Sequence, residues 1–254
     1  MTYQLIVSDW NGTIPKHPTD EILNKEIAYA LLDDAKSKII TGNLLALRDI
    51  LQLHLAKNEI TKQLKAYSRG NVYKSFSRRV LRGKDYEFVS NVINQYVSEC
   101  VENNDVDTRI LRTINLARKC GIKTGILSVS IRHVICRTLI QLNLGDLFET
   151  IVSNSFVTRN IDNELKILGC SFDIYNRKPE CLENRFLKPY QLRDKDVIYF
   201  GDSEDDLGIA EMLPKGNFIV PFFATDTFRQ YAAAKFGAFV PDTEKDPNQH
   251  ILAR

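Results

Sequence analysis

Acidic and hydroxyl side chains stand at the ends of short apolar runs in this 254-residue sequence. Asp9 follows the run LIVS and Ser128 follows the run GIL. Asp202 comes after the run VIYF and one glycine, and Asp206 stands four residues later. We expect each run to be a buried strand of a parallel sheet. Because ligands of such sheets bind at the carboxyl ends of the strands, these side chains are expected to share one site.

The chemistry that this set of side chains supports is phosphoryl transfer. A carboxylate can attack phosphorus and form an aspartyl phosphate. Mg²⁺ prefers oxygen ligands and would offset the repulsion between an anionic nucleophile and an anionic substrate. A serine hydroxyl and a lysine ammonium can hold the remaining phosphoryl oxygens. Lys178, at the start of an expected helix, is the candidate ammonium, and it would also keep nearby carboxylates ionised.

The pattern of elements predicts an α/β fold with a doubly wound parallel sheet. Apolar runs predict strands, and helices are expected between and after them; the strands are 3–8, 123–127, 150–152, 197–200 and 218–220, and the helices are 107–120, 131–142, 179–192, 207–213 and 227–235.

The long segment between the first two strands shows only helical periodicity. Helices are expected from residue 19 or 20 to 31, over 44–55 and 85–102, and near 59–69 and 71–82. The simplest interpretation is an α/β domain formed by residues 1–14 and 105–254, with an all-helical domain of residues 15–104 inserted after its first strand.

Four motifs together resemble the haloacid dehalogenase superfamily of phosphohydrolases. They are DWNGT at 9–13, ILSVS at 126–130, RKPE at 177–180 and GDSEDD at 201–206, in the order and strand positions of that family. The resemblance implies a Rossmann-like core, a helical cap domain, and Mg²⁺-dependent hydrolysis of a small phosphorylated metabolite.

The resemblance also implies a role for each matched residue. Asp9 would be the nucleophile and a metal ligand, Asn11 would bind the metal through its backbone carbonyl, and Asp202 and Asp206 would complete the metal site. Thr13, Ser128, Ser130 and Lys178 would bind the substrate. Lys188 also precedes a proline, but it lies only 14 residues before Asp202 and inside the expected helix, so Lys178 is favoured.

Asn11 departs from the family pattern, which has an acid two residues after the nucleophile. An amide cannot serve as the general acid and base. Four explanations compete: a slow phosphatase or one with activated leaving groups, a phosphonoacetaldehyde hydrolase that cleaves a C–P bond, a regulatory or binding protein without turnover, and an Asp→Asn exchange introduced to trap a substrate. Trp10 fits the second, which needs a Schiff-base lysine such as Lys36, Lys57 or Lys62. The first is favoured.

The expected partners follow from charge and composition. Residues 69–84 carry six basic side chains and no acid, with Tyr73 and Phe76 between them, which suits an anionic substrate. The net charge of +2 argues against nucleic acid as the main partner, although the basic residues 69–84 keep nucleic-acid binding as an alternative. No apolar run is long enough for a membrane helix, and the five cysteines form no C-x-x-C pair, so a cytoplasmic protein with reduced thiols and no signal peptide is expected.

Overall fold

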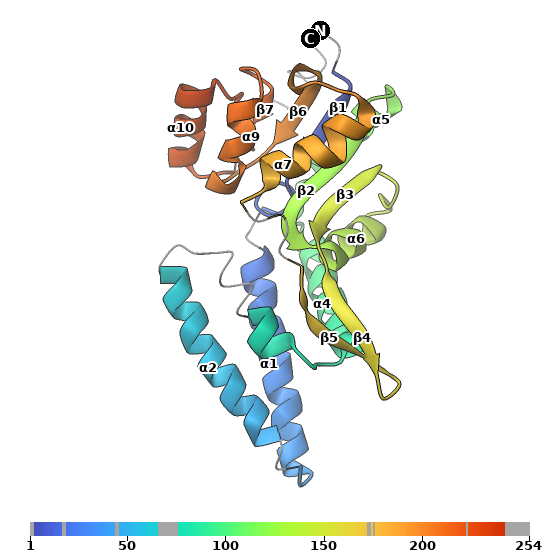
Figure 1. The fold of residues 1–254 in the computed structure, drawn as a ribbon, viewed down its shortest axis with the longest axis vertical. Helices are drawn as coiled ribbons and strands as arrows, with labels where there is room; N and C mark the ends of the chain where they lie inside the picture. Colours follow the sequence, from blue (N-terminus) through green and yellow to red (C-terminus); the bar gives the residue numbers. More distant parts are fainter. Residues whose placement is uncertain are drawn as a thin grey trace. The chain divides into compact units, whose positions relative to one another are not determined.

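A five-stranded sheet forms the centre of the structure, which is a computed structural model. The strands lie in the order β3-β2-β1-β6-β7, and β1 pairs in parallel with both β2 and β6, as β6 does with β7. Figure 1 shows helices between successive strands. The parallel doubly wound sheet predicted from the sequence is confirmed. The strands are β1 (Leu5–Ser8), β2 (Lys123–Ile131), β3 (Thr150–Asn154), β6 (Val197–Phe200) and β7 (Phe218–Ile219).

The structure describes residues 3–16, 19–43, 46–65, 76–171, 174, 176–221 and 223–241. They divide into two units. The first, called here the core unit, comprises Met1–Thr19, Cys100–Ser153 and Asp173–Arg254, and the second, the inserted unit, comprises Asp20–Glu99 and Asn154–Phe172. None of the helices in these described ranges combines the length and apolar character that crossing a membrane requires.

Alternating side chains of the central strands enter two separate hydrophobic clusters. Ile6 and Ile198 pack into one cluster, whereas Leu5 and Val197 pack into the other, as the period of two in a strand requires. Helices α5 and α6 supply the first cluster, and α7, α9 and α10 supply the second. The sheet is therefore covered on both faces, which is why its strands read as continuous apolar runs. The helices of this unit are α5 (Thr108–Lys119), α6 (Arg132–Gln141), α7 (Lys178–Leu182), α8 (Lys188–Tyr190), α9 (Leu207–Met212) and α10 (Asp226–Phe236).

The chain leaves and re-enters the core unit through two adjacent segments. Pro15 forms an isolated antiparallel bridge with Val106, the Asp107 amide donates to the Ile14 carbonyl at 2.7 Å, and the Lys16 amide donates to the Asp105 carbonyl at 2.8 Å. Asp107 also caps α5 by accepting from the Arg109 amide. The long insertion thus starts and ends at one point.

The inserted unit contains strands as well as helices, so the expectation of an all-helical domain is incomplete. Its helices are α1 (Thr19–Ile40), α2 (Ala46–Lys65) and most of α4 (Tyr86–Glu102), together with the short π-helix η1 (Ser77–Leu81). An antiparallel hairpin of β4 (Phe156–Ile161) and β5 (Glu164–Cys170) joins them, although the sequence interpretation assigned these residues to the α/β domain. Its two-residue turn places Asp162 and Asn163 at positive φ, as a type I′ turn requires. The expected helices near 59–69 and 71–82 partly lie outside the described residues.

Candidate active site

Asp9 lies immediately after β1, at the carboxyl end of the central strand of the sheet. Its amide donates to the Phe200 carbonyl at 2.8 Å, which extends the pairing of β1 with β6 by one residue. The residue is 3% exposed. Because β1 and β6 end in register, the residues that follow these two strands converge near Asp9, and β2 continues beside them past Ile126, the partner of Ser8.

A tight turn directly after Asp9 brings this segment against the acidic loop that follows β6. The amides of Thr13 and Ile14 both donate to the Trp10 carbonyl, and Gly12 has a φ of +75°. A Cβ atom on Gly12 would lie 2.2 Å from Asp202 Oδ2, so only glycine fits both the backbone conformation and the contact. The Thr13 hydroxyl donates to Asp202 Oδ1 at 2.9 Å.

Three carboxylates meet at this place. Oxygen atoms of Asp9, Asp202 and Asp206 lie within 4.8 Å of one another, and Asp206 is fully buried. Gly201 permits this approach, since a Cβ there would lie 2.7 Å from the Asp206 Cγ. The structure therefore brings together the first and last acidic motifs that the sequence singles out.

Lys178 links two of these carboxylates. Its Nζ donates to Asp9 Oδ2 at 2.9 Å and to Asp206 Oδ1 at 2.6 Å, and the side chain is almost fully buried. Lys178 is the first residue of α7, where Pro179 suits the first turn of the helix. Lys188 instead pairs with Glu183 at 3.0 Å on an exposed part of the following helical segment.

Tyr199 is a site residue that the sequence analysis missed. Its hydroxyl donates to Asp206 Oδ1 at 2.8 Å, and its ring stacks on Phe218 inside the core. The Asp202 amide donates to Asp206 Oδ2 at 3.2 Å. Both oxygens of Asp206 are thus engaged within the protein. An aromatic residue in an apolar strand is normally interpreted as a core residue. The only sequence signal for a role of Tyr199 in the site is its position two residues before Gly201, on the same face of the strand as Val197.

The pKa values of the acidic cluster reflect its excess of negative charge. Burial, together with the neighbouring Asp9 and Asp206 carboxylates, raises the pKa of Asp202 well above its usual range. Burial also raises the pKa of Asp206 to about 6, although Lys178 opposes the rise. Burial by itself would lower the pKa of Lys178, but Asp206 and Asp9 raise it above its ordinary value, so this lysine is a cation.

The remaining candidate residues lie on neighbouring segments. Ser128 and Ser130 are fully buried near the end of β2, and the Ser130 amide donates to the Ser128 hydroxyl oxygen at 3.2 Å. Ser128 stands two residues beyond Ile126, which pairs with Ser8. Asn11 is half-buried in the turn after Asp9.

Comparison with known protein families agrees with this arrangement. The family model described as haloacid dehalogenase-like hydrolase matches residues 6–211, which is most of the chain. The chain belongs to this family. A comparison with curated proteins gives no match.

Solved structures similar to this haloacid dehalogenase-like hydrolase share its fold at low sequence identity. A protein of unknown function from Bordetella pertussis Tohama I has a TM-score of 0.62 and 12% identity, over 95% of this chain and 99% of its own. A substrate-bound phosphoserine phosphatase has a TM-score of 0.54 and 14% identity, over 100% and 98% of the two chains. A predicted phosphatase from Clostridium acetobutylicum has a TM-score of 0.53 and 16% identity, over 100% of both.

The donor atoms of this hydrolase fit a hard divalent cation. Asp9 and Asp202 offer carboxylate oxygens, the ligand type that Mg²⁺ prefers. Three carboxylates, those of buried Asp9 and Asp206 and of half-buried Asp202, face one ammonium, so a doubly charged cation would balance the cluster. Asp206 has less capacity for a direct metal bond, because it accepts from Lys178, Tyr199 and the Asp202 amide.

Proposed function

We propose that this haloacid dehalogenase-like hydrolase is a Mg²⁺-dependent phosphatase that acts on a small phosphorylated metabolite. The observation that carries the proposal is the buried contact of Asp9 with Lys178, beside Asp202 and Asp206. A carboxylate beside an ammonium at the end of a strand supports binding and attack of a phosphate group, because the ammonium can stabilise the phosphoryl oxygens. The family membership supports hydrolysis as the reaction class.

In the proposed reaction, a carboxylate oxygen of Asp9 attacks phosphorus and forms an aspartyl phosphate. The P–O bond to the leaving group breaks, and the departing oxygen takes up a proton. Water then attacks phosphorus, which releases inorganic phosphate and regenerates Asp9. Lys178 stabilises the negative charge that the phosphoryl oxygens carry in both steps, and Ser128 is proposed to donate to one of them.

Asp9, Asp202 and the backbone carbonyl of Asn11 are the proposed ligands of Mg²⁺, with Asp206 nearby. When bound, the metal would neutralise phosphoryl charge and orient the phosphate. Asp206 would act mainly through Lys178, since Tyr199 and the Asp202 amide hold it in position. Thr13 would hold Asp202 in position in a similar way, because its hydroxyl donates to the Asp202 carboxylate.

Asn11 makes the proposed enzyme a slow one, or one that acts on leaving groups needing little protonation. Its side chain cannot give up a proton to the leaving group or take one from water. This property also favours the second candidate function, a regulatory protein that binds a phosphorylated ligand without turnover.

The C–P cleavage hypothesis receives less support from the described residues. Trp10 is fully buried in the first hydrophobic cluster with Ile14 and Val106, so core packing explains it. Lys36 is exposed and pairs with Asp33 at 3.1 Å. The side chains of Lys57 and Lys62 lie outside the described residues.

Release of inorganic phosphate from a panel of phosphorylated metabolites tests the proposal. We expect turnover that requires Mg²⁺ and disappears in the Asp9→Asn variant. Asp146→Asn, an exposed aspartate on the loop after α6, is the matched control and should keep full activity. Phosphate release that persists in the Asp9→Asn variant would refute the role of Asp9. Ligand-induced thermal stabilisation without turnover would favour the binding protein.

A further inference from the structure

The inserted unit contains a basic groove that the proposed reaction does not use. Its volume is about 840 Å³, and its cationic lining residues are Lys38, Arg48, Arg79, Arg82 and Lys84. All of its lining residues belong to the inserted unit. The cations come from the end of α1, the first turn of α2, and the segment from η1 to Lys84. If the charges were only the solvated face of one helix, they would all come from a single segment. These five cations come from three segments that the fold brings together.

The charge of the groove is strongly positive. Five cations face one carboxylate among the lining residues, that of Asp49, whereas the entire chain has a net charge of only +2. Asp49 pairs with Lys84 at 2.8 Å, and Asp34 on α1 pairs with Lys38 at 2.7 Å. Neither Arg48 nor Arg82 has an ion pair with a described carboxylate. A concave surface with an excess of positive charge raises the local concentration of anions.

The hairpin of the inserted unit fixes one wall of the groove. The Gly83 amide donates to the Ile167 carbonyl at 2.7 Å, and the Ile167 amide donates to the Lys84 carbonyl at 2.9 Å. These bonds tie the turn that carries Arg82 and Lys84 to β5. The wall is therefore held by backbone hydrogen bonds and does not depend on the long basic side chains themselves.

The lining of the groove also restricts the kind of anion that fits. Its volume is in the range of small-molecule sites. Arginine forks suit phosphate oxygens. The lining contains no aromatic ring, and Phe76, from the basic and aromatic stretch of the sequence, is buried with only 3% of its surface exposed. Stacking of nucleobases therefore has no platform among the described lining residues.

We propose that this groove binds a compact small molecule carrying several phosphate groups, such as an inorganic polyphosphate or a polyphosphorylated polyol. The proposal stands independently of the proposed phosphatase reaction, because no residue of the acidic cluster lines the groove. It assigns to the inserted unit an anion site of its own, where Arg48 and Arg82 supply the guanidinium groups.

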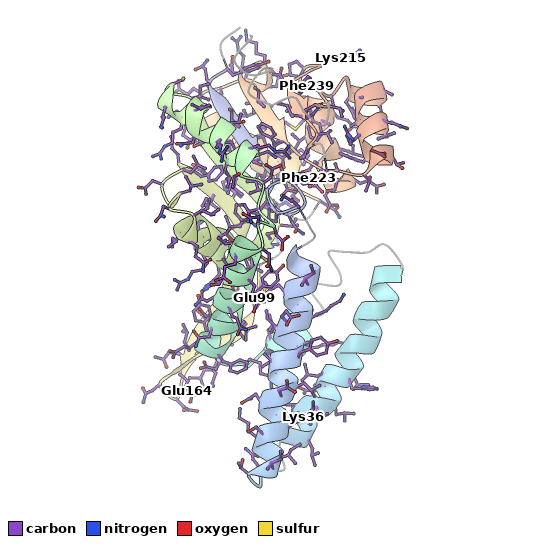
Figure 2. The ribbon with its side chains drawn as sticks, turned by 180° about the vertical axis from the view of Figure 1, so that it is seen from behind. Lys36, Glu99, Glu164, Lys215, Phe223 and Phe239 are labelled. Atoms are coloured by element: carbon purple, nitrogen blue, oxygen red, sulfur yellow. The ribbon has the colours of Figure 1, made fainter. Side chains whose placement is uncertain are left out.

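Isothermal titration of the full-length protein with inorganic tripolyphosphate, in buffer without divalent metal, tests this proposal. We expect binding that weakens as salt concentration rises. The double variant Arg48→Gln, Arg82→Gln should bind about 100-fold or more weakly, since two guanidinium groups and their charge-assisted hydrogen bonds are lost. Lys36→Gln is the matched control: Lys36 lies on α1 (Figure 2), is exposed, and does not line the groove. It should bind as the unmodified protein does, with an unchanged unfolding temperature in all variants.

Three results would overturn the proposal. The first is no binding of tripolyphosphate, and the second is equal weakening by Lys36→Gln and by the double variant. The third is loss of binding in the Asp9→Asn variant, which would move the anion to the strand-end site. A single-stranded RNA oligomer that binds more tightly than tripolyphosphate would replace the compact ligand with a nucleic acid. Absence of phosphatase activity would leave the expected binding result unchanged.

Discussion

Asn11 is the residue on which the rate of the proposed reaction depends most. It stands two positions after Asp9, where the family pattern has a carboxylic acid, and it is half-buried in the turn that Gly12 shapes. Its backbone carbonyl is unaffected by the amide, so metal binding is compatible with asparagine at this position. Proton transfer by this side chain is not compatible with asparagine, because an amide does not gain or lose a proton near neutral pH.

The Asn11→Asp variant should therefore be a faster phosphatase. We expect kcat for an alkyl phosphate to rise by about 10²-fold or more, the usual value of a positioned general acid and base. The gain for 4-nitrophenyl phosphate should be smaller, since its leaving group needs little protonation. Steady-state phosphate release with both substrates measures this. An unchanged rate with the alkyl phosphate would mean that another group moves the proton.

Tyr199 is proposed to position Lys178 through Asp206. Burial, with the Asp206 carboxylate beside it, raises the pKa of Tyr199 well above its usual range, so the hydroxyl remains a donor. Asp206 Oδ1 accepts from both Tyr199 and Lys178, and Tyr199→Phe removes the first of these two donors.

We expect Tyr199→Phe to lower kcat about three- to tenfold, because the net value of one hydrogen bond is roughly 0.5–1.5 kcal/mol. KM should change little. Tyr3→Phe is the matched control, since the Tyr3 hydroxyl is also buried and donates to Asn217 Oδ1 at 3.3 Å, away from the acidic cluster. A comparison of kcat and of unfolding free energy in the two variants separates positioning from stability. Equal kcat values in both would refute the positioning role.

At the scale of elements, the turn after β1 joins two motifs that are 189 residues apart in the sequence, since Thr13 donates to Asp202. Gly12 is central to that turn. In Gly12→Ala the positive φ would cost about 1–2 kcal/mol, and the new Cβ would also displace Asp202. We expect lower stability and a clear loss of Mg²⁺-induced stabilisation.

Gly121→Ala provides the control for backbone strain. Gly121 follows α5 with a φ of +82°, and a Cβ there would meet no atom within 4 Å. Unfolding in denaturant should show a similar strain cost, with an unchanged response to Mg²⁺. If Gly12→Ala retained the full Mg²⁺ response, Asp202 would not be a metal ligand.

The elements that surround the site could be predicted from the sequence because hydrophobic burial determines them. Buried strands such as β1 and β6 read as apolar runs, and Asp107 predicts the start of α5 correctly. The hairpin of β4 and β5 could not be recognised in this way, because most of its residues are exposed or half-buried and give no apolar run. Its only local signal is the pair Asp162–Asn163 at the turn. Tyr199 illustrates the same limit, since its hydroxyl bond depends on a partner that only the fold brings close.

At the scale of the whole molecule, the acidic cluster links stability to pH and metal. The pKa of Asp206 is raised to about 6 and that of Asp202 is raised as well, so the folded metal-free protein binds more protons than the unfolded chain between about pH 4 and 6. Stability from this cluster is therefore lost as the pH rises through that range. Mg²⁺ requires the deprotonated carboxylates.

We therefore expect the Mg²⁺-induced rise in Tm to increase between pH 5 and pH 7. Thermal unfolding at fixed salt, with and without Mg²⁺, measures it. The Asp202→Asn variant should lose most of the Mg²⁺ effect at pH 7. A rise in Tm that is the same at both pH values would contradict the coupling of metal binding to these carboxylates.

The central claim is that Asp9 becomes phosphorylated, and mass spectrometry of the acid-quenched protein tests it most directly. Because Asn11 cannot activate water, the aspartyl phosphate should persist long enough to be trapped after incubation with Mg²⁺ and a reactive phosphoryl donor such as acetyl phosphate. We predict one added phosphoryl group on the peptide that contains Asp9, absent in Asp9→Asn and shorter-lived in Asn11→Asp. A phosphoryl group on another residue, or phosphate release from a protein that never carries one, would contradict the account.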